Sequence, residues 1–76
     1  MRVSESPAGR VFRVVKVVSG GEVGKRLADM GFTEGAEGEV VRGGFLNGPY
    51  QVRILGYDLI LRKSEAAGIE VEAIGA

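Results

Sequence analysis

The chain has 76 residues with ten basic and ten acidic side chains, and it contains neither cysteine nor histidine. This composition excludes disulfide and thiolate chemistry, removes the commonest metal ligand and general base, and lacks the basic excess of nucleic-acid-binding domains. No apolar run approaches the ~18 residues of a membrane span and no signal peptide is recognisable, so we expect one small cytoplasmic domain covering residues 1–76.

The first predicted strand follows a polar lead-in. Residues 1–9 are expected to be loosely ordered and attached only through Val3. Residues 10–18 are dense in β-branched side chains, which predicts a strand. Because the alternation of their apolar side chains is imperfect, we expect either a β-bulge or burial of both strand faces.

One short amphipathic helix is predicted within residues 19–35. Ser19 and Glu22 have the spacing of a capping box, in which each side chain accepts a hydrogen bond from a backbone N–H near the helix start. Apolar side chains then recur at helical spacing: Val23, Leu27 and Met30. This spacing is more typical of core packing than of a partner groove, so we expect the stripe to face the core.

The same segment contains a helix stop signal. Gly31 can adopt the left-handed conformation that ends a helix, because it has no Cβ to clash. Phe32 is then placed to fold back onto Leu27, and Gly35 completes the turn that follows. The helix is therefore predicted to be a short insertion between strands.

Four further strands are predicted downstream: residues 36–42, a strand opened by Pro49, residues 59–62, and a last strand carrying Ile69, Val71 and Ala73. We expect a glycine-rich loop at 43–48, a turn at 56–58 and one helical turn at 63–67. Five short strands cannot cover both faces of an open sheet, whereas a closed sheet has no exposed edges. The prediction is a mainly β protein, a small SH3-like barrel of about five strands with one inserted short α-helix; an OB-like barrel is the second choice.

Two sequence blocks resemble a known family. The first reads R-L-A-D-M-G-F at 26–32 and the second L-R-K-S-E-A-A-G-I-E-V at 61–71. The matching positions include Arg26, Leu27, Met30, Gly31, Phe32, Gly35, Pro49, Arg62, Glu65 and Ala66. In this order and spacing they resemble the FeoA family, small cytosolic proteins of the bacterial ferrous iron transport system. Ser6 stands where the family's lead-in usually has an apolar residue, which adds to the expectation of a loose lead-in.

The resemblance implies an SH3-like barrel with a helical insertion. It also implies an accessory role toward FeoB, a membrane transporter with a cytosolic GTP-hydrolysing domain. A related module forms the last domain of some iron-dependent repressors, so the fold alone does not determine the role.

No catalytic, cofactor or metal site is predicted. Glu37 with Glu39, and Glu70 with Glu72, share a strand face and could approximate a site for Mg²⁺ or Ca²⁺, but a solvated face is the preferred interpretation. Ser64 has no base to activate it. The glycines match no phosphate-binding motif.

A partner contact is predicted at Phe45 and Leu46, with Arg26 as its charged rim. Two large apolar residues in a glycine-rich loop either plug a barrel end or stand exposed as a contact. Arg26 is included because it belongs to the first family-like block and flanks the apolar stripe.

We therefore predict a non-enzymatic accessory protein that binds and modulates the cytosolic part of a FeoB-type transporter. It needs no cofactor, nucleic acid or membrane insertion. The alternatives are an effector or sensor module like the last domain of iron-dependent repressors, and a small-barrel nucleic-acid-binding protein. A repressor would be expected to carry a helix-turn-helix and metal ligands, and this sequence shows neither. A nucleic-acid-binding barrel is disfavoured by the balanced charge and the small number of aromatic residues.

Overall fold

The computed structural model describes residues 1–44, 46 and 48–75. In this part of the chain the strands are β1 (Val11–Val17), β2 (Glu37–Arg42), β3 (Tyr50–Ile54), β4 (Tyr57–Leu61) and β5 (Ile69–Ala73). The helices are the 3₁₀ helix η1 (Val3–Glu5), α1 (Gly21–Asp29) and α2 (Lys63–Ala66). None of the helices in these residues is long and apolar enough to cross a bilayer.

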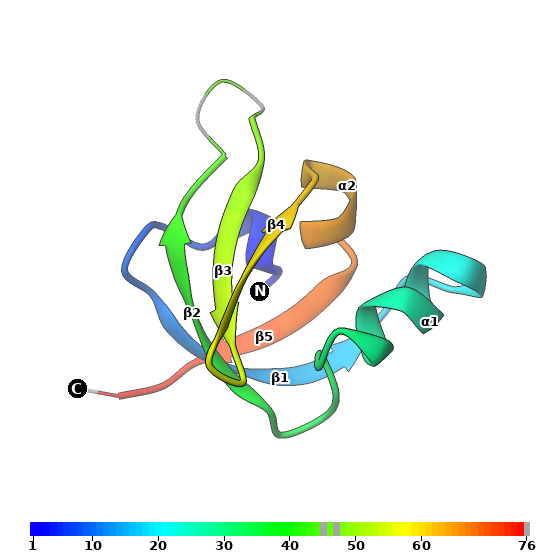
Figure 1. The fold of residues 1–76 in the computed structure, drawn as a ribbon. Helices are drawn as coiled ribbons and strands as arrows, with labels where there is room; N and C mark the ends of the chain where they lie inside the picture. The colour runs from blue at the N-terminus through cyan, green and yellow to red at the C-terminus, as the bar shows by residue number, and fades with distance from the viewer. Residues whose placement is uncertain (45, 47, 76) are drawn as a thin grey trace.

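The strands form one antiparallel sheet in the order β4-β3-β2-β1-β5. Figure 1 shows β3 and β4 crossing in front of β1 and β5, so the sheet curls onto itself around a single core. The predicted mainly β, SH3-like barrel with one short inserted helix is thereby confirmed.

The core draws on every strand and on all three helices. Its buried members are Val3, Phe12, Val14, Leu27, Phe32, Val40, Tyr50, Val52, Ile54, Leu61, Ala66, Ile69 and Val71. The register of β1 against β5 shifts between Val14 and Lys16, which confirms the predicted bulge. Opposite Phe12, a Cβ on Gly38 would lie 2.9 Å from the phenylalanine ring and 2.5 Å from the Arg53 carbonyl oxygen. Only glycine lets β2 approach the core this closely.

The first residues are attached more extensively than the sequence predicts. Val3 is buried, as expected, but it is not alone. The Val71 N–H donates to the Met1 carbonyl at 2.7 Å, and the Met1 amino group donates to the Val71 carbonyl at 3.1 Å. The Arg2 guanidinium donates to the Ala67 carbonyl at 2.6 Å. Most of these contacts involve backbone groups, which the side-chain pattern of a sequence does not show.

Ser6 also belongs to this attachment although it is polar. It is buried, and its hydroxyl donates to the Arg2 carbonyl at 3.1 Å. The hydroxyl of Tyr50, a residue of β3, donates a hydrogen bond of 2.8 Å to the Ser4 carbonyl. The missing apolar residue is therefore replaced by a hydrogen-bonded serine, because a buried hydroxyl is tolerated once it has a partner.

The start of α1 differs from the prediction. Gly20 is the N-cap residue, and no side chain caps the helix, so the predicted capping box of Ser19 and Glu22 is wrong. The Val18 N–H still donates to the Gly68 carbonyl at 2.8 Å, and the Ser19 hydroxyl lies directly over Gly68. Ser19 is thus packed against the turn before β5 and cannot cap α1.

The end of α1 agrees with the prediction. Gly31 has φ +112°, its N–H donates to the Ala28 carbonyl at 3.0 Å, and the Phe32 N–H donates to the Leu27 carbonyl at 3.1 Å. This pair of hydrogen bonds is the Schellman motif, and Phe32 and Leu27 are both buried beside it. Gly35 follows in the next turn and donates its N–H to the Val14 carbonyl at 2.8 Å.

The turn between β3 and β4 lies one residue earlier than predicted. Ile54 pairs with Tyr57, which leaves Leu55 and Gly56 as a two-residue turn with φ +52° and +80°. Positive φ at both positions is the type I′ pattern, which favours asparagine or aspartate at the first position. Leu55 is not a residue type that predicts such a turn, so the sequence places the turn at 56–58. In the structure Tyr57 and Asp58 already belong to β4.

We expect Gly31→Ala to lower the free energy of unfolding by about 1–2 kcal/mol, because a Cβ is unfavourable in the left-handed region. A Cβ at Gly31 would also lie 2.8 Å from the Leu55 side chain. Gly43→Ala is the matched control, since Gly43 has no positive φ and a Cβ there meets nothing within 4 Å. Chemical denaturation measures both, and equal midpoints for the two variants would contradict the assigned helix end.

Candidate functional site

Helix α1 presents most of its surface to solvent. Figure 1 shows it extending away from the curled sheet, and only Leu27 of the helix is fully buried. Met30 packs partly against the core, as predicted, whereas Val23 is exposed. The expectation that the whole stripe faces the core is therefore wrong at Val23, because the first turn of α1 lies beyond the core.

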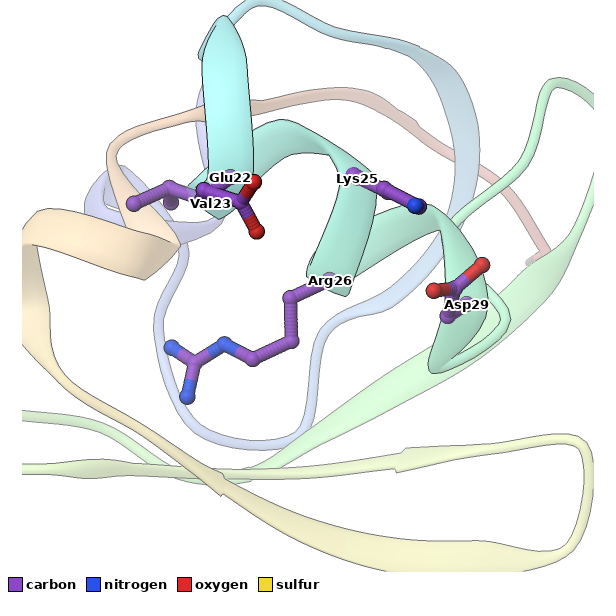
Figure 2. A pocket seen from close by; sticks show the side chains of 5 residues that line it. All are labelled: Glu22, Val23, Lys25, Arg26 and Asp29. Atoms are coloured by element: carbon purple, nitrogen blue, oxygen red, sulfur yellow. The ribbon is translucent and has the colours of Figure 1, made fainter.

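An open hollow runs along the exposed side of α1. It is lined by Glu22, Val23, Lys25, Arg26 and Asp29. Figure 2 shows the Arg26 side chain reaching away from the helix, in a different direction from Lys25 and Asp29. Arg26 is thus the one of these labelled charged residues that turns toward the rest of the molecule.

Arg26 forms an ion pair with Glu65 of α2. The Glu65 side chain is only 8% exposed, while that of Arg26 is 59% exposed. The second Glu65 oxygen accepts the Arg62 N–H at 2.8 Å. A buried carboxylate needs such partners, so this cluster links α1 to the start of α2.

A second groove lies between α1 and α2. Its lining includes Ser19, Val23, Arg26, Arg62, Ser64 and Glu65. Two arginines and two hydroxyls offer hydrogen-bond donors, and the single carboxylate is already bonded. This arrangement suits a carboxylate or another anion better than a cation. Glu65 shares this lining with Ser64, but its two oxygens are bonded to Arg26 and to the Arg62 N–H, so it is not free to act as a general base for Ser64.

The predicted contact residue Leu46 is 84% exposed and has φ +53°. At this exposure Leu46 does not plug the barrel end, whereas Tyr50 is buried and a Cβ on Gly44 would lie 2.5 Å from its ring. Phe45, the other predicted contact residue, lies outside the residues that the structure describes. Leu46 lies between β2 and β3, whereas Arg26 lies on α1.

A further exposed surface was missed in the sequence. Leu55, Tyr57 and Ile60, on the β3–β4 hairpin, are all more than 60% exposed. Beside them Arg53 Nε donates to Asp58 Oδ1 at 2.7 Å, and this hydrogen bond lowers the pKa of Asp58 below its ordinary value. The run Y-D-L-I-L at 57–61 has no regular apolar–polar alternation that would single out Tyr57 and Ile60 as exposed, so the residue pattern alone does not find this surface.

Two carboxylates of the acidic pairs share an arginine partner. Glu37 and Glu72, from β2 and β5, both form ion pairs with Arg13 at 3.3 and 3.1 Å. Across residues 1–44, 46 and 48–75, no group of three or more acidic side chains could hold a metal ion. Glu37 and Glu72 are both more than half exposed, so these ion pairs lie on a solvated face of the sheet.

Comparison with known proteins supplies the family. Residues 1–73 match the FeoA domain. A fusion protein of Fe(2+) transport protein A and Fe(2+) transporter FeoB, from Porphyromonas gingivalis, is 40% identical over 76 residues. This match covers all of the present chain and 9% of the fusion protein.

Two solved structures show the same fold. The FeoA protein of Chlorobium tepidum is 36% identical, with a TM-score of 0.88, covering 99% of this chain and 71% of that one. The zinc complex of Stenotrophomonas maltophilia FeoA is 30% identical, with a TM-score of 0.84, covering 95% and 89% of the two chains. The latter protein is described as a prokaryotic SH3 domain protein.

We expect Arg26→Ala to lower the free energy of unfolding by about 1–2 kcal/mol, because Glu65 loses a partner while remaining largely buried. Lys25→Ala is the matched control on the same helix, and it should change stability by less than about 0.5 kcal/mol. Thermal and urea unfolding measure both variants. If Arg26→Ala were as stable as Lys25→Ala, the ion pair would not hold α1 to α2.

We further expect no tight Fe²⁺ binding by the isolated chain, since it lacks histidine and cysteine. Anaerobic titration calorimetry with Fe²⁺ is the measurement. A stoichiometric transition with a dissociation constant below about 1 µM would contradict this expectation; that constant corresponds to a binding free energy of about −8 kcal/mol.

Proposed function

Because the chain belongs to the FeoA domain family, we propose that it is a non-enzymatic accessory domain of bacterial ferrous iron uptake. It acts in the cytoplasm, where it binds the cytosolic part of a FeoB-type membrane transporter. Binding shifts the assembly or the conformational balance of that transporter. The iron is handled by the transporter rather than by this chain.

The observation that carries the proposal is the Porphyromonas gingivalis relative. All 76 residues align within one polypeptide that also contains the transporter FeoB. Covalent fusion keeps two domains at a high effective concentration. A homologous domain outside such a fusion needs a docking surface of its own to reach the same partner.

The exposed surface offers suitable chemistry for docking. Protein interfaces combine apolar anchors with a polar rim, and arginine is enriched among the residues that contribute most. Leu46 provides an exposed apolar side chain, and Arg26 provides a guanidinium that remains more than half exposed while paired. These are the two described members of the contact predicted from the sequence.

The alternatives have less support. A repressor's terminal module would share this fold, but the family match and the fused relative both favour the transport system. A nucleic-acid-binding barrel needs a basic surface, and the ten positive side chains here are balanced by ten negative ones.

We expect the chain to bind the purified cytosolic domain of a FeoB-type transporter, and Leu46→Ser to weaken binding about tenfold or more. Leu46→Ser is tested alone and together with Phe45→Ser, and Val11→Ser serves as a control at another exposed apolar side chain. Arg26→Glu should slow association most strongly at low salt, and its unfolding midpoint is measured beside the binding rate because the variant also removes the ion pair with Glu65. Calorimetry or surface plasmon resonance measures binding, and circular dichroism of the same samples reports the fold.

Two results would count against the proposal. No binding by the wild-type chain would overturn the partner itself. Full binding by a folded Leu46→Ser/Phe45→Ser variant would place the contact on another face of the molecule.

A further inference from the structure

The two edges of the sheet are treated differently. The outer edge of β5 is covered by the first two residues. Val71 exchanges backbone hydrogen bonds with Met1, and Arg2 forms an isolated antiparallel β-bridge with Glu70. The other edge is β4, which pairs only with β3 in the sheet order. One edge is therefore sealed by the chain itself, and the other is left open.

The register shows which backbone groups of β4 are free. The two-residue turn makes Ile54 and Tyr57 a hydrogen-bonded pair, so Tyr57, Leu59 and Leu61 direct their N–H and C=O groups toward β3. The backbone groups of Asp58 and Ile60 point the other way. Within residues 1–44, 46 and 48–75, no backbone hydrogen bond reaches them from outside the sheet.

This edge lacks the features that usually protect an edge strand. Residues 57–61 read Y-D-L-I-L, without proline or lysine, and their pairing with β3 shows no bulge. The one charge, on Asp58, is neutralised by Arg53. Tyr57 and Ile60 are 70% and 63% exposed. Such an edge is a template for another strand.

The charges at the end of β4 indicate what kind of strand fits. Leu61 leads directly into Arg62, which lines the groove between α1 and α2 together with Arg26. The only carboxylate of that groove, Glu65, is already bonded, while the half-exposed Arg26 guanidinium has five N–H donors to share. An incoming carboxylate would complement this end, and apolar side chains on the face of β4 that carries Ile60 would complement that exposed residue.

We propose that β4 accepts an extended segment of the transporter's cytosolic part as an added antiparallel strand. The segment has an acidic side chain near its N-terminal end, beside Arg62 and Arg26, followed by alternating apolar residues along β4. Backbone hydrogen bonds to Asp58 and Ile60 hold it in place. This inference rests on the proposed function, because it names the way in which that partner is bound.

Amide hydrogen exchange, followed by NMR on the labelled chain, tests the proposal directly. In the free chain the amides of Asp58 and Ile60 should exchange fast, and those of Leu59 and Leu61 slowly. With the unlabelled cytosolic domain of a FeoB-type transporter as the probe, the Asp58 and Ile60 amides should slow by at least about tenfold.

Variants provide an independent measurement. Ile60→Pro removes an outward N–H without removing a hydrogen bond to β3, and it should weaken binding about tenfold. Ile60→Val keeps the N–H and should bind like the wild type. Arg62→Gln should weaken binding more than Lys16→Gln, which removes an exposed positive charge on β1. The Arg62→Gln comparison remains decisive if Ile60→Pro fails to fold.

Each outcome has a defined meaning. Binding without protection of Asp58 and Ile60, and with unchanged affinity of Ile60→Pro or Arg62→Gln, overturns strand addition but leaves the proposed function intact. No binding by the wild-type chain overturns both. Protection of the same amides in the concentrated chain alone would identify a second copy of this chain as the occupant, which also contradicts the proposal.

Discussion

The position of the exposed helix depends on a buried carboxylate. Glu65 is 8% exposed, and its charge is unfavourable in that place unless it is paired. Arg26 of α1 and the Arg62 N–H supply the partners from two directions. Since only Leu27 of α1 is fully buried, apolar packing alone anchors the helix weakly. The ion pair therefore helps to hold α1 against α2 and contributes to the shape of the groove between the helices.

The two edge strands of the sheet, β5 and β4, differ in what covers them. Met1 and Arg2 cover β5, which keeps that edge from pairing elsewhere. The edge of β4 stays open beside exposed apolar side chains and leads into the arginine-lined groove. One edge strand is thus covered by the chain's own first residues, and the other has outward-pointing backbone groups available to another strand.

Much of this fold could be predicted from the sequence, because strands and the Gly31 stop signal depend on local residue types. The failures arise where long-range contacts override local preference: Ser19 packs on the turn before β5 instead of capping α1, and Leu55 adopts a turn that usually favours asparagine. For the site, Arg26 was identified but its partner was not. Glu65 lies in the second family-like block, 39 positions downstream (65 − 26), and only the fold brings the two together.

We propose that this chain touches the cytosolic part of a FeoB-type transporter along the β4 side. Site-specific photocrosslinking in cells tests it most directly, with benzoylphenylalanine at position 60 on β4 or at position 16 on β1. If β4 is the docking edge, position 60 crosslinks to the transporter and position 16 does not. Crosslinks of equal yield from both positions, or none from either, would contradict it.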